Sequence, residues 1–317
     1  MKTIISIIMA AMLCGCSQSN DGYVSVEGGC WSTTYHITYS GSRSLADSVQ
    51  SVIDEVNAQL SPFAEGSVIS RVNASAEPVR VGAMFADVFA LSQRVCSLSG
   101  GAFDPTVAPL VNLWGFGYRD GDSDIPSDST IAEALAWVGM PDCRMDSSGR
   151  VVKKAARTEF NFSAIAKGYG VDCIAAMLRR NGVENYMVEV GGEIALAGKN
   201  PRGERWHIQI DAPVDGNLEH EGLRVLELTD CGVATSGNYR NFRETAAGRV
   251  WHTISPVTGY PVRSEVLSAT VIAPDCATAD ALATASMAMP VDSAMAMLGK
   301  LEGVRAILVM ADSVVSL

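Results

Sequence analysis

The order in which strand and helix patterns follow one another most constrains the fold of this chain. Alternating apolar residues predict a strand over 35–39, and apolar residues at helical spacing predict helices over 44–60 and 83–98. A hairpin is predicted over 144–160, and it leads into another helix from Ala164. Hairpins beside helices differ from the strict strand-helix alternation of a doubly wound sheet. The sequence therefore predicts an α+β fold with mixed or antiparallel sheets.

The second half of the chain continues this mixed order. Strands are predicted over 186–190, 194–196, 206–210, 225–228 and 267–272, with turns at Gly191-Gly192 and 200–203. An alanine-rich helix that contains Asp280 follows the last of them. Because no internal repeat or low-complexity linker divides the chain, we expect one domain over 23–317.

The first residues have the pattern of an export signal. Lys2 precedes an apolar run over 4–13, which is too short to cross a bilayer as a stable helix. Leu13-Cys14-Gly15-Cys16 then resembles a bacterial lipoprotein signal with cleavage before Cys16 and diacylation of its sulfur. An ordinary secretory signal, with Cys16 incidental, is the alternative. We expect a signal peptide over 1–15, a lipidated tether over 16–22 and a domain outside the cytoplasm, lipid-anchored to a bacterial membrane in the cell envelope.

The net charge and the cysteine spacing argue against a nucleic-acid partner and against a structural zinc site. The formal net charge of −11 argues against nucleic acid as a partner, because phosphate backbones require basic surfaces. Beyond Cys14 and Cys16, no Cys-x-x-Cys pair occurs, so a structural zinc site is not expected. Export leaves one or two disulfides open, and the other thiols are expected to be buried. The remaining cysteines are at 30, 96, 143, 173, 231 and 276.

The segment Ala-Thr-Ala-Asp-Ala-Leu-Ala-Thr at 277–284 carries candidate metal ligands. Asp280 and Thr284 are four residues apart, which stacks both side chains on one face of a helix. Their oxygens suit a hard cation such as Mg²⁺, although the same spacing is common on solvated helix faces. Further ligand-cradling loops are predicted at 101–106, 161–169 and 252–259. The start of the helix after Asn161 offers unpaired N–H groups to phosphate oxygens, and Lys167 adds a positive charge.

Together these segments resemble the ApbE family of flavin transferases, which are FAD:protein FMN transferases. Ser-Thr-Thr-Tyr-His-Ile at 32–37 is similar to the family's opening Met-Gly-Thr-x-Tyr motif. The other similar segments, in the family's order, are Leu-Ser-Pro-Phe at 60–63 with the block at 67–73, Gly-Ala-Phe-Asp-Pro-Thr at 101–106, Ser-Ala-Ile-Ala-Lys-Gly-Tyr at 163–169, Gly-Gly-Glu-Ile at 191–194, Ala-Thr-Ser-Gly at 234–237, His-x-Ile-x-Pro-x-Thr-Gly at 252–259 and Ala-Asp-x-x-x-Thr at 279–284. The resemblance implies a single α+β domain related to the T-fold.

The resemblance also implies how the site is built. Mg²⁺ would be held by the Ala164 carbonyl, the Asp280 carboxylate and the Thr284 hydroxyl. FAD would be contacted by Trp31, Phe63, Ala102, Phe103, Asp104, Asn161, Lys167 and Ile254. For the aromatic residues, core packing is the alternative role.

Four positions depart from the family's pattern. Trp31 and Ser32 replace the methionine and glycine of the opening motif, so the resemblance implies a differently shaped wall beside the flavin. Asn161 stands where aspartate is usual and brings no charge. Ala283 occupies a place where some members carry a second carboxylate, which leaves Asp280 as the acidic side chain expected on the metal.

The implied reaction is transfer of FMN from FAD to a threonine or serine hydroxyl of an acceptor protein, with release of AMP. Lys167 would neutralise charge on the pyrophosphate, and His252 is the candidate general base. The resemblance suggests a redox-pump subunit or a secreted flavoprotein as the acceptor. Two other functions stay open, namely an Mg²⁺-dependent FAD pyrophosphatase and a non-catalytic FAD-binding lipoprotein.

Overall fold

The computed structural model describes residues 18–20, 22–119, 125–211, 222–237, 242–245 and 248–317. The predicted signal peptide over 1–15 and Cys16 lie outside these residues. Within the predicted tether, β1 (Gln18–Asn20) pairs antiparallel with residues 23–25. Part of the tether is therefore attached to the edge of a sheet.

A nine-stranded sheet dominates the molecule, and all of its neighbouring strands pair antiparallel. Its order is β1-β2-β3-β7-β8-β11-β14-β15-β16, so strands from both ends of the chain share one sheet. This arrangement confirms the predicted α+β fold. The remaining bounds are β2 (Tyr23–Cys30), β3 (Thr33–Ser40), β7 (Tyr186–Val190), β8 (Glu193–Ala197), β11 (Cys231–Gly237), β14 (Val266–Ala273), β15 (Arg305–Met310) and β16 (Val314–Ser316).

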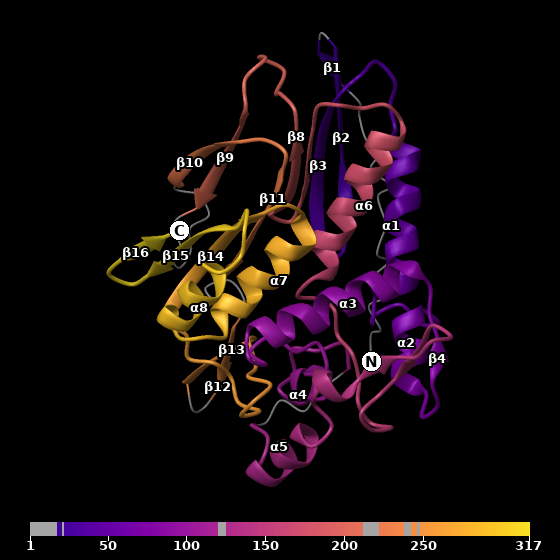
Figure 1. Ribbon diagram of the computed structural model, residues 1–317, viewed down its shortest axis with the longest axis vertical. Helices are drawn as coiled ribbons and strands as arrows, with labels where there is room; N and C mark the ends of the chain where they lie inside the picture. The colour runs from indigo at the N-terminus through magenta and orange to yellow at the C-terminus, as the bar shows by residue number, and fades with distance from the viewer. Residues whose placement is uncertain (1–17, 21, 120–124, 212–221, 238–241, 246–247) are drawn as a thin grey trace, which may run out of the picture.

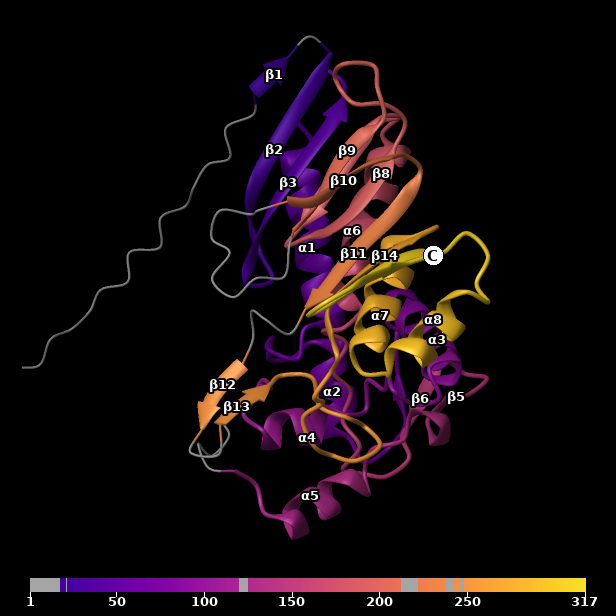
Figure 2. The same ribbon diagram turned by 90° about the vertical axis from the view of Figure 1, so that its left-hand side faces the viewer.

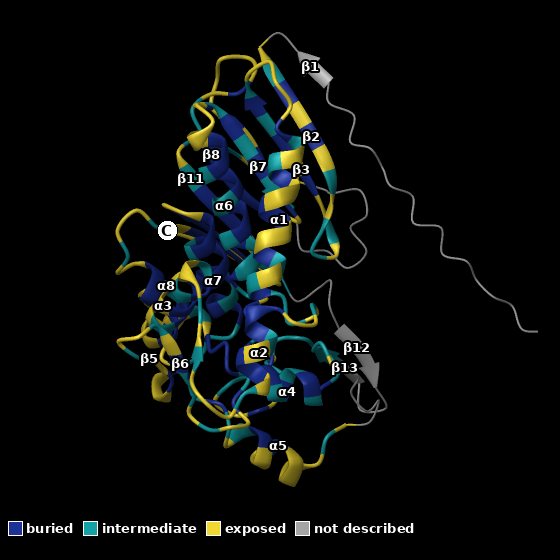
Figure 3. Ribbon diagram, turned by 90° about the vertical axis from the view of Figure 1, so that its right-hand side faces the viewer, coloured by how far each residue is buried: buried dark blue, intermediate teal, exposed yellow. Residues whose placement is uncertain are grey.

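Helices cover one face of this sheet, and a hairpin covers part of the other (Figures 1 and 2). The helices α6 (Ala166–Arg180) and α7 (Cys276–Met287) pack on the sheet, and α1 (Ala46–Leu60) packs beside α6. Figure 3 shows the outer side of α1 exposed. On the opposite face, Ile194 and Val233 belong to a core cluster with Trp206 and Leu228 of the hairpin. That hairpin consists of β9 (Trp206–Asp211) and β10 (Gly222–Leu228).

Shorter elements form the end of the molecule below the sheet in Figure 1. The helix α3 (Ala83–Leu98) lies between them and α7, and its bounds agree with the prediction. The predicted hairpin at 144–160 is shorter, because its strands end at Val152 and a loop continues to α6. The other elements are α2 (Val68–Ala74), α4 (Ala108–Leu113), α5 (Asp128–Leu135), η1 (Met140–Asp142), α8 (Val291–Leu298), β4 (Val79–Arg80), β5 (Arg144–Met145), β6 (Arg150–Val152), β12 (Phe242–Thr245) and β13 (Gly248–Trp251).

The helices and the cysteines can be compared with the predictions about membrane spans and disulfides. Among the helices in the described part of the chain, none has the length and apolar character needed to cross a membrane. The cysteines at 30, 96, 143, 173, 231 and 276 are all free thiols. Burial raises the pKa of Cys96 to about 12 and that of Cys143 to about 11, so both stay protonated at neutral pH.

Candidate active site

A cavity of about 830 Å³ lies where the sheet meets the shorter elements. It is bordered by strand ends from β3, β8 and β11, by the start of α6, by α7 and by loops from the lower end. Such a volume is typical of a site for a small molecule or cofactor. The predicted site residues that line it are Phe63, Ala102, Phe103, Asp104, Asn161, Ala164, Lys167, His252, Ile254, Asp280 and Thr284.

Trp31 is placed differently from the other predicted FAD residues. This residue sits in the β2–β3 turn with a φ of 48° and is not among the residues that line the cavity. A Cβ built at Gly170 of α6 would lie 2.1 Å from the Trp31 ring. The indole therefore packs against α6, where glycine leaves room for it, and its contact with FAD stays a prediction.

The junction of α6 and α7 brings the predicted metal ligands together. The Gly168 N–H donates to Asp280 Oδ2 at 3.0 Å, and Asp280 is only 3% exposed. The Asp172 carboxylate of α6 accepts hydrogen bonds from the Cys276 and Ala277 N–H groups at 3.0 and 2.8 Å. These bonds fix the first turn of α7 on α6. Asp280 is thus held in a buried position and not on a solvated helix face.

Gly168→Ala is expected to lower the free energy of unfolding by about 1–3 kcal/mol and to reduce turnover. An added Cβ would lie 2.5 Å from the Cys276 carbonyl oxygen and 2.8 Å from the Asp280 Cβ, so α7 would have to shift. Urea denaturation measures the loss. Gly29→Ala is the matched control, because its Cβ would meet only the Thr33 carbonyl oxygen at 3.7 Å. Equal stability of the two variants would contradict this account.

A buried charge cluster stands beside this junction. Lys167 Nζ contacts Glu193 Oε1 at 2.6 Å, and the Glu193 side chain is 5% exposed. Burial, and then the charge of Asp280, raises the pKa of Glu193, and burial also raises the pKa of Asp280. Lys167 thus pairs with Glu193 in a region that also contains the Asp280 carboxyl group. Glu193 belongs to the Gly-Gly-Glu-Ile segment at 191–194, and no role was predicted for it from the sequence. The Gly191-Gly192 turn before it marks a place where backbone and ligand can approach closely.

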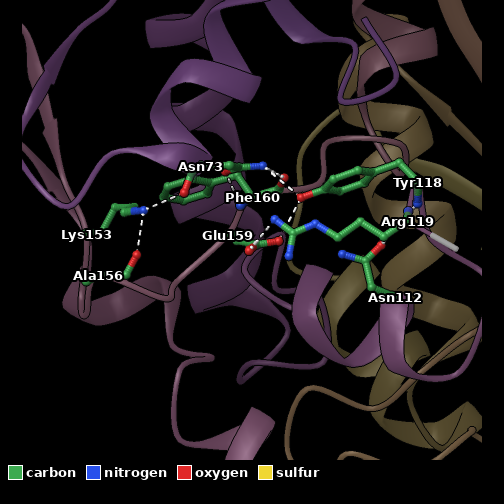
Figure 4. Close-up of polar contacts among 8 residues, drawn as sticks. All are labelled: Asn73, Asn112, Tyr118, Arg119, Lys153, Ala156, Glu159 and Phe160. Atoms are coloured by element: carbon green, nitrogen blue, oxygen red, sulfur yellow. Dashed lines mark hydrogen bonds and ion pairs between the residues drawn. The ribbon is translucent and has the colours of Figure 1, made fainter. Parts of the chain in front are cut away.

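A polar network fixes residues 159 and 160 of the loop before α6 (Figure 4). Asn73 Nδ2 donates to the Phe160 carbonyl oxygen at 2.9 Å, and Asn73 Oδ1 accepts from the Phe160 N–H at 2.8 Å. Tyr118 connects to the same network by donating to Glu159 at 2.8 Å. The next residue, Asn161, accepts a hydrogen bond from the Ser163 N–H at 2.8 Å. Asn161 Oδ1 therefore shapes the loop, and its amide nitrogen is the group it can offer a ligand.

The loop at 101–106 is also braced internally. Asp104 accepts hydrogen bonds from Thr106 through Oδ1 and from the Met140 N–H through Oδ2 at 2.8 Å. Both carboxylate oxygens therefore have partners within the protein, and Asp104 first serves to position its loop. Phe103 is buried, whereas Phe63 is 70% exposed at the cavity and packs edge-on against Tyr118 with 6.1 Å between ring centroids. Phe63 is thus the aromatic face that a ligand ring can reach.

The loop at 252–259 borders another side of the cavity. His252 lines the cavity, with its ring 6.5 Å from that of Phe116. Ile254 is bridged to Pro261, and the Gly259 carbonyl oxygen accepts a hydrogen bond from Trp114 Nε1 at 2.8 Å. These contacts hold the loop against α4 and place an imidazole at the cavity. At the α7 side, the Thr284 and Ser236 hydroxyl oxygens lie 3.2 Å apart.

The comparison with known proteins agrees with this arrangement. The model of the ApbE family matches residues 31–308. This chain belongs to the ApbE family. It is 37% identical over 302 residues to an FAD:protein FMN transferase of Vibrio cholerae, an alignment that covers 92% of this chain and 89% of that protein. It is 34% identical over 305 residues to one of Haemophilus influenzae, with 92% and 88% covered.

A solved structure shares the ApbE fold seen here. The crystal structure of the flavinyl transferase ApbE from Pseudomonas stutzeri, in its apo form, superposes with a TM-score of 0.83 at 30% identity. The match covers 96% of this chain and 94% of that one. Ala283 of α7 is fully buried in the hydrophobic core. That position therefore points into the packed interior here.

Proposed function

We propose that this ApbE member transfers FMN from FAD to a threonine or serine hydroxyl of an acceptor protein and releases AMP. Relatives named FAD:protein FMN transferase, more than 30% identical over most of both chains, support this activity. The observation that carries it is the cavity itself, which gathers Lys167, Asp280 and His252 around one space. Positive charge, a cation ligand and an imidazole base are the groups that phosphoryl transfer requires.

The residues at the α6–α7 junction fit Mg²⁺. The described residues hold no cluster of three or more His, Cys, Asp or Glu side chains suited to a metal, so hydroxyl and carbonyl ligands are needed beside Asp280. The Gly168 N–H lies in the first turn of α6, where helical N–H groups lack an intrahelical acceptor, and it bonds to Asp280. Ala164, Asp280 and Thr284 would hold the ion. When bound, Mg²⁺ would neutralise charge on the pyrophosphate.

The side chains suggest how the bonds change. An acceptor hydroxyl in the cavity forms a bond to the FMN-side phosphorus, and the bond from that phosphorus to the AMP oxygen breaks. His252 takes the hydroxyl proton, and AMP leaves with the electron pair of the broken bond. Lys167 uses one N–H for Glu193 and keeps two for phosphate oxygens. Phe63 offers an aromatic face to one ring of FAD.

The test incubates the protein with FAD, MgCl₂ and an acceptor flavoprotein domain that carries a target threonine. We expect the acceptor to gain the mass of FMN while AMP appears in equal amount. Replacing the target threonine by alanine should leave only slow AMP release, because water is not oriented as the hydroxyl is. Equal AMP release with and without acceptor, and no mass gain, would favour a pyrophosphatase. Absence of AMP in every reaction would favour a binding protein.

A lipid anchor is part of this proposal. The Leu-Cys-Gly-Cys segment at 13–16, after a short apolar run, supports diacylation at Cys16 and a catalytic domain outside the cytoplasm. An acceptor in the cell envelope, such as a redox-pump subunit or a secreted flavoprotein, would then be within reach.

Cys16→Ser is expected to release the protein from membranes without changing its activity on soluble substrates. The two acyl chains of the anchor contribute about 0.8 kcal/mol per buried CH₂, and the thioether that joins them to the protein would be absent. Membrane fractionation measures the distribution, and Cys30→Ser serves as the matched control. Membrane attachment of the Cys16 variant after signal cleavage would argue against this anchor.

A further inference from the structure

We propose that Glu193 is a positioning residue that holds the Lys167 ammonium group away from Asp280 and so keeps the Asp280 carboxylate available for a cation. This inference rests on the Mg²⁺ site of the proposed function and assigns a role to the glutamate of the Gly-Gly-Glu-Ile segment at 191–194.

The contacts of Lys167 carry the argument. Its Nζ lies 2.6 Å from Glu193 Oε1, and Asp280 is not its ion-pair partner although the adjacent Gly168 N–H bonds to Asp280 at 3.0 Å. Burial alone lowers the pKa of Lys167, but the charges of Glu193 and Asp280 together raise it above its usual value. Lys167 therefore stays charged and interacts with both carboxylates. Which carboxylate it contacts decides how much negative charge Asp280 can offer.

The backbone around Glu193 fixes this choice. Gly191 and Gly192 have φ values of 60° and 100°, a left-handed region that glycine enters without strain. The Gly191 N–H donates to the Thr34 carbonyl oxygen at 3.1 Å, and the Gly192 N–H donates to Glu189 Oε1 at 2.7 Å. The turn therefore directs Glu193 into the buried end of β8 beside Lys167. The strand, and not the flexible lysine, sets where the ammonium group lies.

The ion pair between Lys167 and Glu193 affects how Asp280 can bind a cation. Glu193 and Asp280 bring two carboxyl groups to a buried region beside the Lys167 ammonium group, and Glu193 is the one in ion-pair contact with it. Glu193 Oε2 is buried without a hydrogen-bond partner in the described structure. An unpartnered carboxylate oxygen is costly in such a place, and a nearby cation would offset that cost. If Glu193 lost its charge, Lys167 would pair with Asp280 and compete with the metal.

The experiment titrates MgCl₂ alone against the protein and its variants, with the melting temperature as the readout. Glu193→Gln is expected to raise the Mg²⁺ concentration at half-maximal stabilisation at least tenfold, as for other residues that support metal ligands. Lys167→Met should bind Mg²⁺ at least as tightly as the wild type, although its affinity for FAD should fall. The double variant should return to near the wild-type midpoint. Glu133→Gln, which breaks the exposed ion pair to Arg157, is the matched control.

A crystal structure of the Glu193→Gln variant separates repositioning from a loss of charge alone. We expect Lys167 Nζ within about 4 Å of the Asp280 carboxylate, which is ion-pair distance. An unmoved lysine, an unchanged Mg²⁺ midpoint in Glu193→Gln, or a double variant no better than Glu193→Gln would each overturn the inference. If Glu193→Gln does not fold, weaker Mg²⁺ binding in Lys167→Met would overturn it. A wild-type protein that does not respond to Mg²⁺ would instead overturn the metal site, and this inference with it.

Discussion

Asp280→Asn is expected to lower Mg²⁺-dependent turnover of FAD by at least about a hundredfold while the protein stays folded. The carboxylate is the acidic ligand of the proposed metal site, and the Lewis-acid role of a metal contributes several kcal/mol to such reactions. Asparagine keeps an oxygen that can accept the Gly168 hydrogen bond at 3.0 Å. Asp280→Ala would leave that buried N–H without a partner, at a cost of about 1–3 kcal/mol.

Steady-state AMP release across a series of MgCl₂ concentrations measures this effect, and circular dichroism with thermal melting checks the fold. Asp142→Asn is the matched control, because Asp142 is an exposed carboxylate 3.7 Å from Lys154 and is not among the residues that line the cavity. Because burial raises the pKa of Asp280, Mg²⁺ binding should release protons at low pH and weaken as the pH falls through that raised pKa. Full activity of Asp280→Asn with Mg²⁺ present would refute the metal assignment.

His252→Asn is expected to slow FMN transfer by about 10²–10⁴-fold, the usual contribution of a general base, and to leave FAD affinity nearly unchanged. A base acts in the transition state, whereas FAD binding relies on Lys167, Phe63 and the loops around them. The imidazole lines the cavity from the loop after β13, so it can reach a hydroxyl that enters there.

Single-turnover transfer to an acceptor domain gives the rate, and equilibrium titration with FAD gives the affinity. His207→Asn is the control, since His207 lies on β9 next to Glu227 of β10 at 3.9 Å and is not part of the cavity lining. A parallel loss of rate and affinity in His252→Asn would assign this residue to binding. An unchanged rate would require another base.

Several elements could be predicted because their signals are local. The helix at 83–98 is followed by the turn signal Gly100-Gly101, and the strand at 186–190 has a regular alternation of buried residues. Both elements have the predicted bounds. The strand β11 and the helix α8 were not predicted. Three consecutive residues of β11 are buried, so its pattern lacks the alternation that marks a half-exposed strand.

Some residues of the candidate site could also be predicted from the sequence, whereas the positions of others depend on the tertiary structure. Motif spacing identified Lys167, Asp280, Thr284 and His252, and the structure brings all four to one cavity. Trp31 was assigned to the site because of its place in a motif, but the space above Gly170 determines where its ring packs. Glu193 had no assigned role, since its pairing with Lys167 joins residues 26 positions apart in the chain.

The sequence by itself determined the fold class, the family and the chemical types of the site residues, because helix periodicity, turn residues and motif order are properties of neighbouring positions. Only the tertiary structure decided that Asp280 is buried, that Gly168 donates to it, and that Glu193 and not Asp280 holds Lys167. Burial sets the cost of each charge, and contacts across the α6–α7 and β8 junctions set its partner. Neither is encoded at any single position of the chain.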